Sequence, residues 1–274
     1  METGQKIIQS NNISEPINEL SIQVNLSGLS FFVLNSVSSK IDYLESVNFD
    51  KKQTPNELLD QLIHHFNTSE ALNNEFSKVT VIHCNELATL VPKPLFDETN
   101  LIDYLKFNSK ILKTDFITYD QVKIADIMVV YVPLVNINNF IFDRFGGFEY
   151  KHSASILINR VLTLEKNTKQ SKMYVNIEAS HFEIVVIKNN LLQFYNRFEF
   201  ITKEDFIYYL LFTAEQLQLN PEEFPLVLMG SIDKSDELYK IAYKYIRDVN
   251  LLNSDSMLYS NDSSSKNFTL LNSL

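Results

Sequence analysis

The pattern of hydrophobic and polar positions occurs twice along the chain. Apolar residues alternate with polar ones near 20 to 26, 29 to 37 and 40 to 49, which predicts a three-stranded meander. A second meander is predicted near 172 to 178, 181 to 188 and 191 to 200. Val24-Asn25-Leu26 and Val175-Asn176-Ile177 open the first hairpins of the two meanders at an offset of 151 residues. A repeat on this scale indicates two tandem structural units.

Each meander is followed by a predicted amphipathic helix that begins at a threonine. Thr54 caps the first, with proline at the next position, and Thr202 caps the second. Apolar strands at 79 to 84 and 225 to 230 come next, and both read as parallel strands. The remaining predicted elements are helices near 100 to 107, 134 to 145, 154 to 164 and 235 to 247, and strands near 116 to 119 and 127 to 132.

Composition limits the classes of partner. The chain has 274 residues, of which 45% are hydrophobic, so it can form large cores. The net charge of -10 opposes binding to nucleic acid or to an anionic membrane. We expect no direct membrane insertion, because no apolar run reaches about 18 residues. Cys84 is the single cysteine and lies in an apolar strand, which predicts a buried, inert thiol and a cytoplasmic protein.

The order of the elements resembles the actin, sugar-kinase and Hsp70 superfamily, whose two ribonuclease H-like lobes face each other across a nucleotide cleft. The chain is similar to the branch that contains the pilus-assembly protein PilM and the cell-division protein FtsA, in the segment from Ile127 to Glu149. It also looks like an uncharacterised Bacteroidetes family, a domain of unknown function. The resemblance implies an α/β fold with two βββαβα lobes, a duplicated ribonuclease H-like (actin-like ATPase) fold.

This resemblance divides the chain into four parts. Residues 1–19 are expected to form a flexible tail, and residues 20–147 the first ribonuclease H-like lobe. Residues 148–252 are expected to form the second lobe, led in by Phe148-Glu149-Tyr150. Residues 253–274 are expected to form a polar C-terminal tail, because serine and asparagine dominate residues 254 to 266.

In active relatives each hairpin starts with Asp-x-Gly, which binds magnesium and admits phosphate. The aligned positions here are Asn25-Leu26-Ser27 and Asn176-Ile177-Glu178, and the adenosine-binding Gly-Gly becomes Gly230-Ser231. Asparagine lacks the negative charge that a hard dication prefers. The chain has only five glycines to approach phosphate closely. The resemblance therefore implies that ATP hydrolysis by the usual route is lost.

We expect ligand-binding residues in the cleft, but we assign no catalytic residue, no metal ligand and no cofactor. The cleft candidates are Asn25, Ser27, Ser30, Asn176, Glu178, Ser180, Gly230 and Ser231. A simpler interpretation is that the two asparagines only close their hairpins. His181 could form an acid and base triad with Glu178 and Ser180, but a solvated turn is the simpler expectation.

These observations favour a catalytically degenerate actin-like protein that acts as a protein-binding or assembly module, through a protein partner or self-association. The alternative is a nucleotide-binding ATPase or kinase-like enzyme with ATP in a rearranged phosphate site. A purely structural homodimer is a third possibility.

Overall fold

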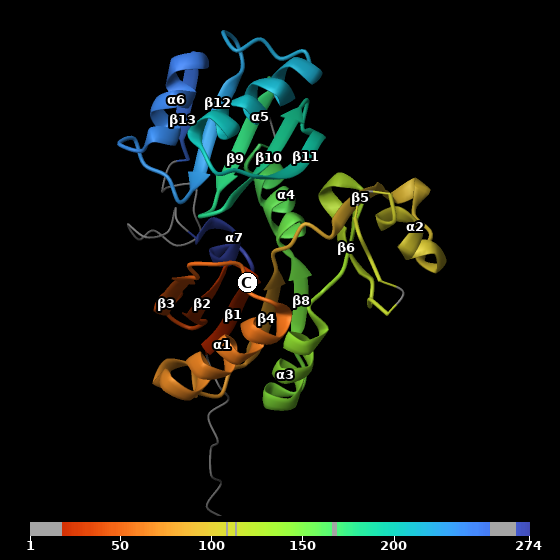
Figure 1. The fold of residues 1–274 in the computed structure, drawn as a ribbon, viewed down its shortest axis with the longest axis vertical. Coiled ribbons are helices and arrows are strands. Elements are labelled where there is room, and N and C mark those ends of the chain that lie inside the picture. The colour runs from red at the N-terminus through yellow and green to blue at the C-terminus, as the bar shows by residue number, and fades with distance from the viewer. Residues whose placement is uncertain (1–17, 108, 113, 166–168, 253–266) are drawn as a thin grey trace, which may run out of the picture.

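The computed structural model describes residues 18–107, 109–112, 114–165, 169–252 and 267–274. Two five-stranded sheets lie one above the other in Figure 1, each with helices on its outer face. The first sheet has the order β3-β2-β1-β4-β8. Its strands are β1 (Asn18–Asn25), β2 (Gly28–Asn35), β3 (Lys40–Asn48), β4 (Lys78–His83) and β8 (Glu149–His152). Helices α1 (Pro55–Thr68) and α3 (Val135–Phe145) cover its outer face.

The second sheet repeats this topology in the order β11-β10-β9-β12-β13. Its strands are β9 (Lys172–Ile177), β10 (His181–Lys188), β11 (Leu191–Glu199), β12 (Pro225–Gly230) and β13 (Asp248–Leu251). Helices α5 (Lys203–Gln216) and α6 (Glu237–Tyr245) cover its outer face. In both sheets three antiparallel strands are followed by two parallel ones. The expected fold class, a two-lobed α/β protein of ribonuclease H-like units, is confirmed.

Matching caps explain why α1 and α5 begin at equivalent places. The Thr54 hydroxyl accepts from the amide of Glu57 and the Glu57 carboxylate accepts from the amide of Thr54, which is a capping box. Thr202 and Asp205 form the same arrangement at the start of α5. Each helix then buries its apolar stripe against its own sheet.

The strand register corrects part of the alignment between the two meanders. Both meanders have a register shift, between Val33 and Leu34 in the first and between Val186 and Ile187 in the second. If Val33 corresponds to Val186, the pairing carries Asn25 onto Glu178 and not onto Asn176. The offset between equivalent residues is 151 for the third strands, but it is 153 for the first two strands. The turn between β10 and β11 is shorter than the turn between β2 and β3, which absorbs the difference.

Two segments near the sequence boundaries also differ from expectation. Residues 149–152, placed at the start of the second lobe from the sequence, form β8 and pair in parallel with β4 of the first sheet. This pairing satisfies backbone groups along that side of β4. Residues 18 and 19 of the expected tail belong to β1, and residues 1–17 lie outside the described residues.

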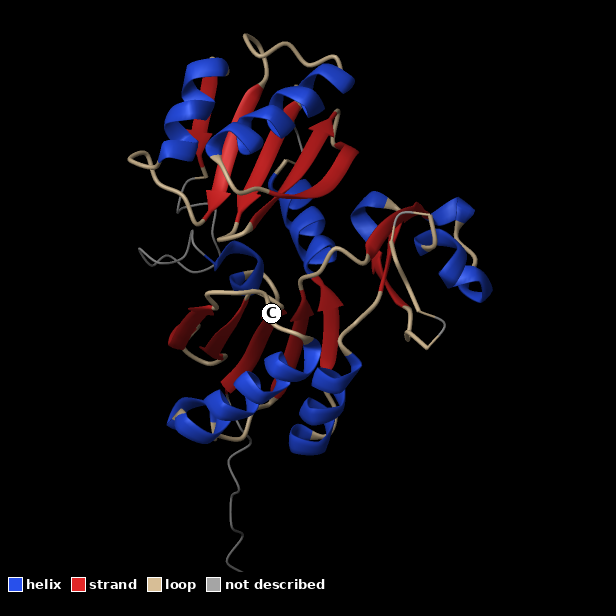
Figure 2. Ribbon diagram, viewed as in Figure 1, coloured by secondary structure: helices blue, strands red, loops and turns tan. Residues whose placement is uncertain are grey.

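A separate small unit is inserted between β4 and α3. It contains the antiparallel sheet β5-β7-β6, formed by β5 (Ala88–Pro92), β6 (Thr118–Val122) and β7 (Ile127–Tyr131), with helix α2 (Leu101–Leu105). We call residues 88–131 the insertion; it projects to one side of the two lobes in Figures 1 and 2. Its own small core includes Val91, Leu105 and Met128.

Two helices lie between the lobes. Helix α4 (Ser153–Leu164) connects them, and its side chains Leu157 and Ile158 are fully buried. The short helix α7 (Phe268–Leu271) lies beside it, between the two sheets. Residues 267–274 are therefore not the tail that the sequence indicated, while residues 253–266 lie outside the described residues. Within the part of the chain that the structure describes, no helix combines the length and apolar character needed to cross a membrane.

Candidate functional site

The turns of the two first hairpins meet between the lobes. Asn25, the last residue of β1, leads into the turn at Leu26-Ser27, and Glu178-Ala179-Ser180 follows β9 at the equivalent place. The turns enclose a cavity of about 30 Å³. Its lining includes five of the eight candidates: Asn25, Ser27, Ser30, Glu178 and Ser180. A cavity of this size holds about one water molecule.

The chemistry of the two turns is unequal. The side chain of Asn25 accepts a hydrogen bond from the Ser27 amide at 3.0 Å, so it closes its own turn. Glu178 is half-buried at the matching position. Burial, followed by the negative charge of Glu183, raises the pKa of Glu178 to about 8, although a hydrogen bond with Gln23 opposes the shift. Near neutral pH one turn therefore presents an amide and the other a mainly uncharged carboxyl group.

His181 lies against the same cavity. It is 3% exposed, so the expectation of a solvated turn is wrong for its side chain. Burial, followed by the positive charges of Arg197 and Lys52, lowers the pKa of His181 well below its usual value. Its Nδ1 atom has no hydrogen-bond partner among the described residues. The ring is therefore a neutral group at the cavity wall.

Asn176 occupies a different place from the one its sequence alignment indicated. Its side chain is fully buried and donates to Oε2 of Glu183 at 3.1 Å and to the Thr269 hydroxyl at 3.3 Å. Glu183 also accepts from the Tyr195 hydroxyl at 2.7 Å and from the Ser153 hydroxyl at 3.4 Å. Asn176 thus belongs to a polar cluster that faces α4 and α7.

Gly230 has a structural explanation. Its φ angle is +88°, and a Cβ atom there would overlap the Ile177 carbonyl oxygen and lie 2.9 Å from Oδ1 of Asn176. The Ser231 amide donates to the Ile177 carbonyl oxygen at 2.7 Å. Close approach of β12 to β9 therefore requires glycine at this position, without any adenosine.

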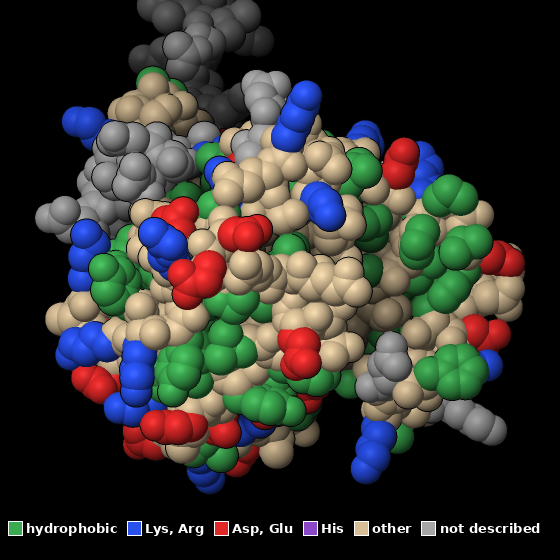
Figure 3. Space-filling model, turned by 90° about the horizontal axis from the view of Figure 1, so that it is seen from above, with side chains coloured by type: hydrophobic (Ala, Val, Ile, Leu, Met, Phe, Trp, Pro, Cys, Tyr) green, Lys and Arg blue, Asp and Glu red, His purple; other side chains and the backbone are tan. Residues whose placement is uncertain are grey.

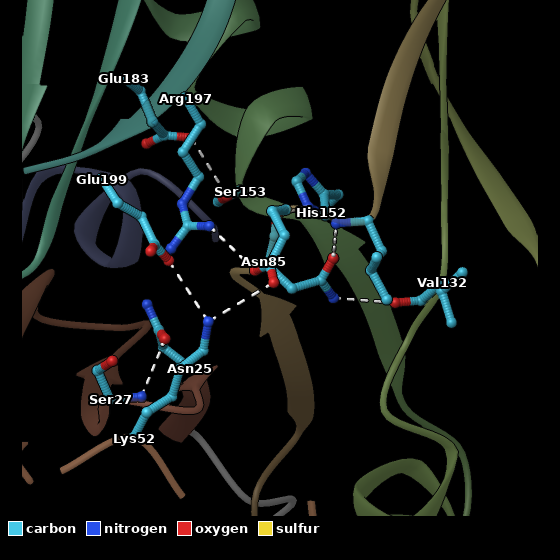
Figure 4. A network of polar contacts seen from close by, with 12 residues as sticks. Asn25, Ser27, Lys52, Asn85, Val132, His152, Ser153, Glu183, Arg197 and Glu199 are labelled. Carbon is cyan, nitrogen blue, oxygen red and sulfur yellow. Dashed lines mark hydrogen bonds and ion pairs between the residues drawn. The ribbon is translucent and has the colours of Figure 1, made fainter. Parts of the chain in front are cut away.

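Charged side chains bridge the two lobes at the mouth of the cleft (Figure 4). Nζ of Lys52, in the first lobe, lies 3.4 Å from the Glu199 carboxylate of β11. Nη1 of Arg197, also on β11, lies 3.3 Å from the carboxylate of Glu86, which follows β4. Lys52 also lies 3.5 Å from Glu86. This network was not expected from the sequence, where its signal is the presence of charged residues within the apolar third strand of the second meander.

Residues 267–274, which we call the cleft segment, fill the space behind this network. Phe268, Leu270 and Leu271 are at most 3% exposed. Phe268 packs in a cluster with side chains of the second sheet and α4, whereas Leu270 and Leu271 pack with side chains of β2 and β4. The sequence carries a weak signal for this burial, namely the apolar triplet within Phe268-Thr269-Leu270-Leu271.

Cys84, directly after β4, packs in the same cluster as Leu270 and Leu271 of the cleft segment. The thiol is free and buried, as the sequence predicted. Burial, followed by the charges of Glu183 and Glu178, raises its pKa. Among the described residues, no group of three or more His, Cys, Asp or Glu side chains is arranged to hold a metal ion.

Comparison with solved structures supports the fold. A Bacteroides thetaiotaomicron protein with an actin-like ATPase fold and unknown function is similar over 95% of this chain and 98% of its own, with a TM-score of 0.80 and 21% identity. The PilM–PilN type IV pilus biogenesis complex contains a chain that is 10% identical at a TM-score of 0.60, with 92% of this chain and 96% of that one covered. The ethanolamine utilization protein EutJ from Carboxydothermus hydrogenoformans is 7% identical at a TM-score of 0.50, over 94% and 90% of the two chains.

No significant match is found among proteins with curated descriptions. A family model does match residues 9–249, which include the first sheet, the insertion and all of the second sheet except the last two residues of β13. The family is described as a protein of unknown function, DUF3822. The chain therefore belongs to the DUF3822 family, and its fold is that of the actin-like ATPases.

Proposed function

We propose that this protein is a catalytically degenerate actin-like protein that works as a protein-binding or assembly module. The observation that carries the proposal is the state of the inter-lobe cleft. The hairpin turns enclose only about 30 Å³, and the cleft segment fills the space behind them. Sites for small organic ligands commonly measure about 300 Å³ or more. This cleft therefore favours a role without a bound nucleotide.

The polar groups at the turns support the same conclusion. Magnesium prefers several oxygen ligands with negative charge. Asn25 supplies an amide, and Glu178 has a pKa of about 8, so it is mainly protonated at neutral pH. The network of Lys52, Glu86, Arg197 and Glu199 holds the lobes together where phosphate groups would need to enter.

The insertion offers a surface for a protein partner. Apolar side chains gather on it in Figure 3, on the right of the view. The most exposed are Leu95, Ile102, Phe107, Leu112 and Phe116, from 45% to 83% exposed. Exposed apolar patches of this kind are typical of protein interaction sites. PilM, which has a similar fold, occurs in a complex with PilN.

Calorimetric titration with ATP, with and without magnesium, tests the loss of nucleotide function. We expect no binding heat and no phosphate release above background. Parallel assays use Glu178→Gln, which keeps the shape of the side chain. Turnover in the parent that disappears in this variant would overturn the proposal and establish the nucleotide-binding enzyme.

Affinity purification from the source cells tests the binding role. The parent chain is compared with a Phe107→Ser/Leu112→Ser variant, in which two exposed insertion side chains are made polar. We expect a protein partner to be retained by the parent and lost from the variant. The control is a Val37→Ser variant, because Val37 is 79% exposed on the first lobe, far from the insertion in sequence. Equal recovery of the partner with all three chains would show that the insertion does not bind it.

We also propose a cytoplasmic location, which the single free thiol of Cys84 supports. Fractionation of source cells, with detection of this chain in each fraction, tests it.

A further inference from the structure

We infer that the cleft between the lobes is a peptide-binding site, and that the cleft segment is its exchangeable occupant. The ligand class is a short peptide with an aromatic residue, a hydroxyl residue and two aliphatic residues in succession, followed after one residue by a second hydroxyl. In this chain that peptide is Phe268-Thr269-Leu270-Leu271-Asn272-Ser273.

Both lobes contact the cleft segment, as they would contact a ligand bound between them. The second lobe receives the Phe268 ring in its apolar cluster and donates from Asn176 to the Thr269 hydroxyl. The first lobe receives Leu270 and Leu271 against Phe32 and Ile82. Each lobe thus supplies an apolar surface together with a specific polar partner.

Hydroxyl contacts fix the segment in register on the first lobe. The hydroxyls of Ser273 and Ser21 lie 2.7 Å apart, although 252 residues separate them in sequence. The Ser46 hydroxyl donates to Oδ1 of Asn267 at 2.8 Å. Polar contacts at both ends and an apolar centre specify one sequence direction and one register, which simple hydrophobic filling would not need.

Other features distinguish this occupant from an ordinary core element. The segment pairs with neither sheet, and each five-stranded sheet is complete without it. Among the described residues, the buried side-chain oxygens Oδ1 of Asn176 and Oδ1 of Asn272 have no donor. Buried acceptors without partners weaken the contact.

Attachment in the same chain explains how the segment occupies the site. Residues 253–266 separate it from the last described residue of the second lobe. A ligand that belongs to the same chain as its site acts at an effective concentration on the order of millimolar. A free peptide must compete against that concentration, so the intact protein should respond only to millimolar peptide. This inference rests on the proposed function in one respect, that the cleft holds peptide and not nucleotide.

The test is fluorescence anisotropy with a labelled peptide of residues 267–274 added to full-length protein. Two variants release the resident segment: Phe268→Ser/Leu270→Ser removes its apolar anchors, and Thr269→Val/Ser273→Ala keeps its shape but removes both hydroxyls. We expect both to bind the free peptide at least tenfold more tightly than the parent does. The control, Phe107→Ser/Leu112→Ser, makes the same kind of change on the insertion and should behave as the parent.

Several outcomes would overturn the inference. They are failure of both folded variants to bind, equal binding by parent and variants, or equal binding of a scrambled peptide. Should the serine variant fail to melt cooperatively, the Thr269→Val/Ser273→Ala variant decides alone. Titration of ATP into the parent is independent of these arms, so ATP binding would count against the proposed function while peptide binding by the variants would still establish the peptide site.

Discussion

Nζ of Lys52 lies 3.4 Å from Oε1 of Glu199, and this ion pair joins the loop after β3 in the first lobe to β11 in the second. Both side chains are about half exposed or more, at 48% and 63%. Arg197, two residues before Glu199, makes the parallel contact to Glu86 with a side chain that is only 9% exposed. The two bridges therefore differ in burial, although both connect the lobes.

The difference in burial predicts unequal effects of the two cations on stability. Lys52→Ala should lower the free energy of unfolding by less than about 1 kcal/mol, because exposed ion pairs contribute little. Arg197→Ala should cost about 2–3 kcal/mol, because it removes a mostly buried guanidinium that hydrogen-bonds to the Glu86 carboxylate. Urea unfolding of the two variants measures this. Equal losses of unfolding free energy would show that burial does not determine how much each ion pair contributes to stability.

Gly230→Ala should destabilise the protein by about 3 kcal/mol or more. The φ angle of +88° disfavours a side chain, and the new Cβ would lie 2.7 Å from the Ile177 amide nitrogen. Gly147→Ala is the matched control, because a Cβ there meets nothing within 4 Å. Thermal melts of both variants are compared. A Gly230→Ala protein as stable as the control would contradict the close approach of β12 and β9.

The buried His83 ring should make the folded protein less stable in acid. Its Nδ1 accepts from the Leu134 amide, its Nε2 lies 2.9 Å from Oδ1 of Asn138, and burial lowers its pKa to about 4. The unfolded chain binds this proton near pH 6.5, so the contribution is present above that pH and is lost as pH falls toward 4. Proton uptake by His83 in the unfolded chain should therefore lower the free energy of unfolding by about 2 kcal/mol at pH 5 relative to pH 7.5.

The measurement is urea unfolding at the two pH values. His83→Gln should show a smaller loss between pH 7.5 and pH 5 than the parent, whatever its absolute stability. His64→Gln, the same substitution at an exposed position of α1, is the control. An unchanged pH slope in His83→Gln would rule out His83 as a source of acid sensitivity.

The Glu178 carboxyl group should have the opposite effect, so that stability falls as the pH rises. Its pKa of about 8 lies above the unfolded value, so the folded state retains a proton that the unfolded state releases, and stability falls as pH rises from about 4.5 to about 8. Glu178→Gln removes this fall. Because the side chain is only half-buried, screening limits the gain over the parent to about 1–2 kcal/mol at pH 8. Glu204→Gln on exposed α5 is the control. A gain that does not grow with pH would refute the raised pKa.

Cys84 should resist a bulky maleimide in the folded protein and react completely after denaturation. Burial, together with Glu183 and Glu178, raises the pKa of the thiol, and the reactive thiolate is therefore scarce. Mass spectrometry after timed exposure measures labelling. Rapid labelling without unfolding would show that the cleft opens widely.

The sequence by itself determined most of the elements and their order. Alternation of apolar residues predicted both meanders, and the threonine caps predicted where α1 and α5 begin, because these signals depend on neighbours within a few residues. The third strands of the two meanders were also correctly aligned. A free, buried Cys84 followed from its apolar strand in the same way.

The site was predictable only in part. Five of the eight candidates line one cavity, but the sequence paired Asn25 with Asn176, whereas the strand register pairs it with Glu178. Both asparagines follow a valine in an apolar run, so local pattern cannot distinguish the two alignments. A shift of two residues keeps every side chain on the same face of the sheet, and only hydrogen bonding between strands decides it.

Only the tertiary structure decided what lies between the lobes. Arg197 meets Glu86, 111 positions earlier in the chain, and Thr269 meets Asn176 across 93 positions. Neither pair has a local pattern, because such contacts depend on how the two sheets pack around α4. The same packing turns residues 267–274, polar and apolar in about equal number, from an expected tail into the buried occupant of the cleft.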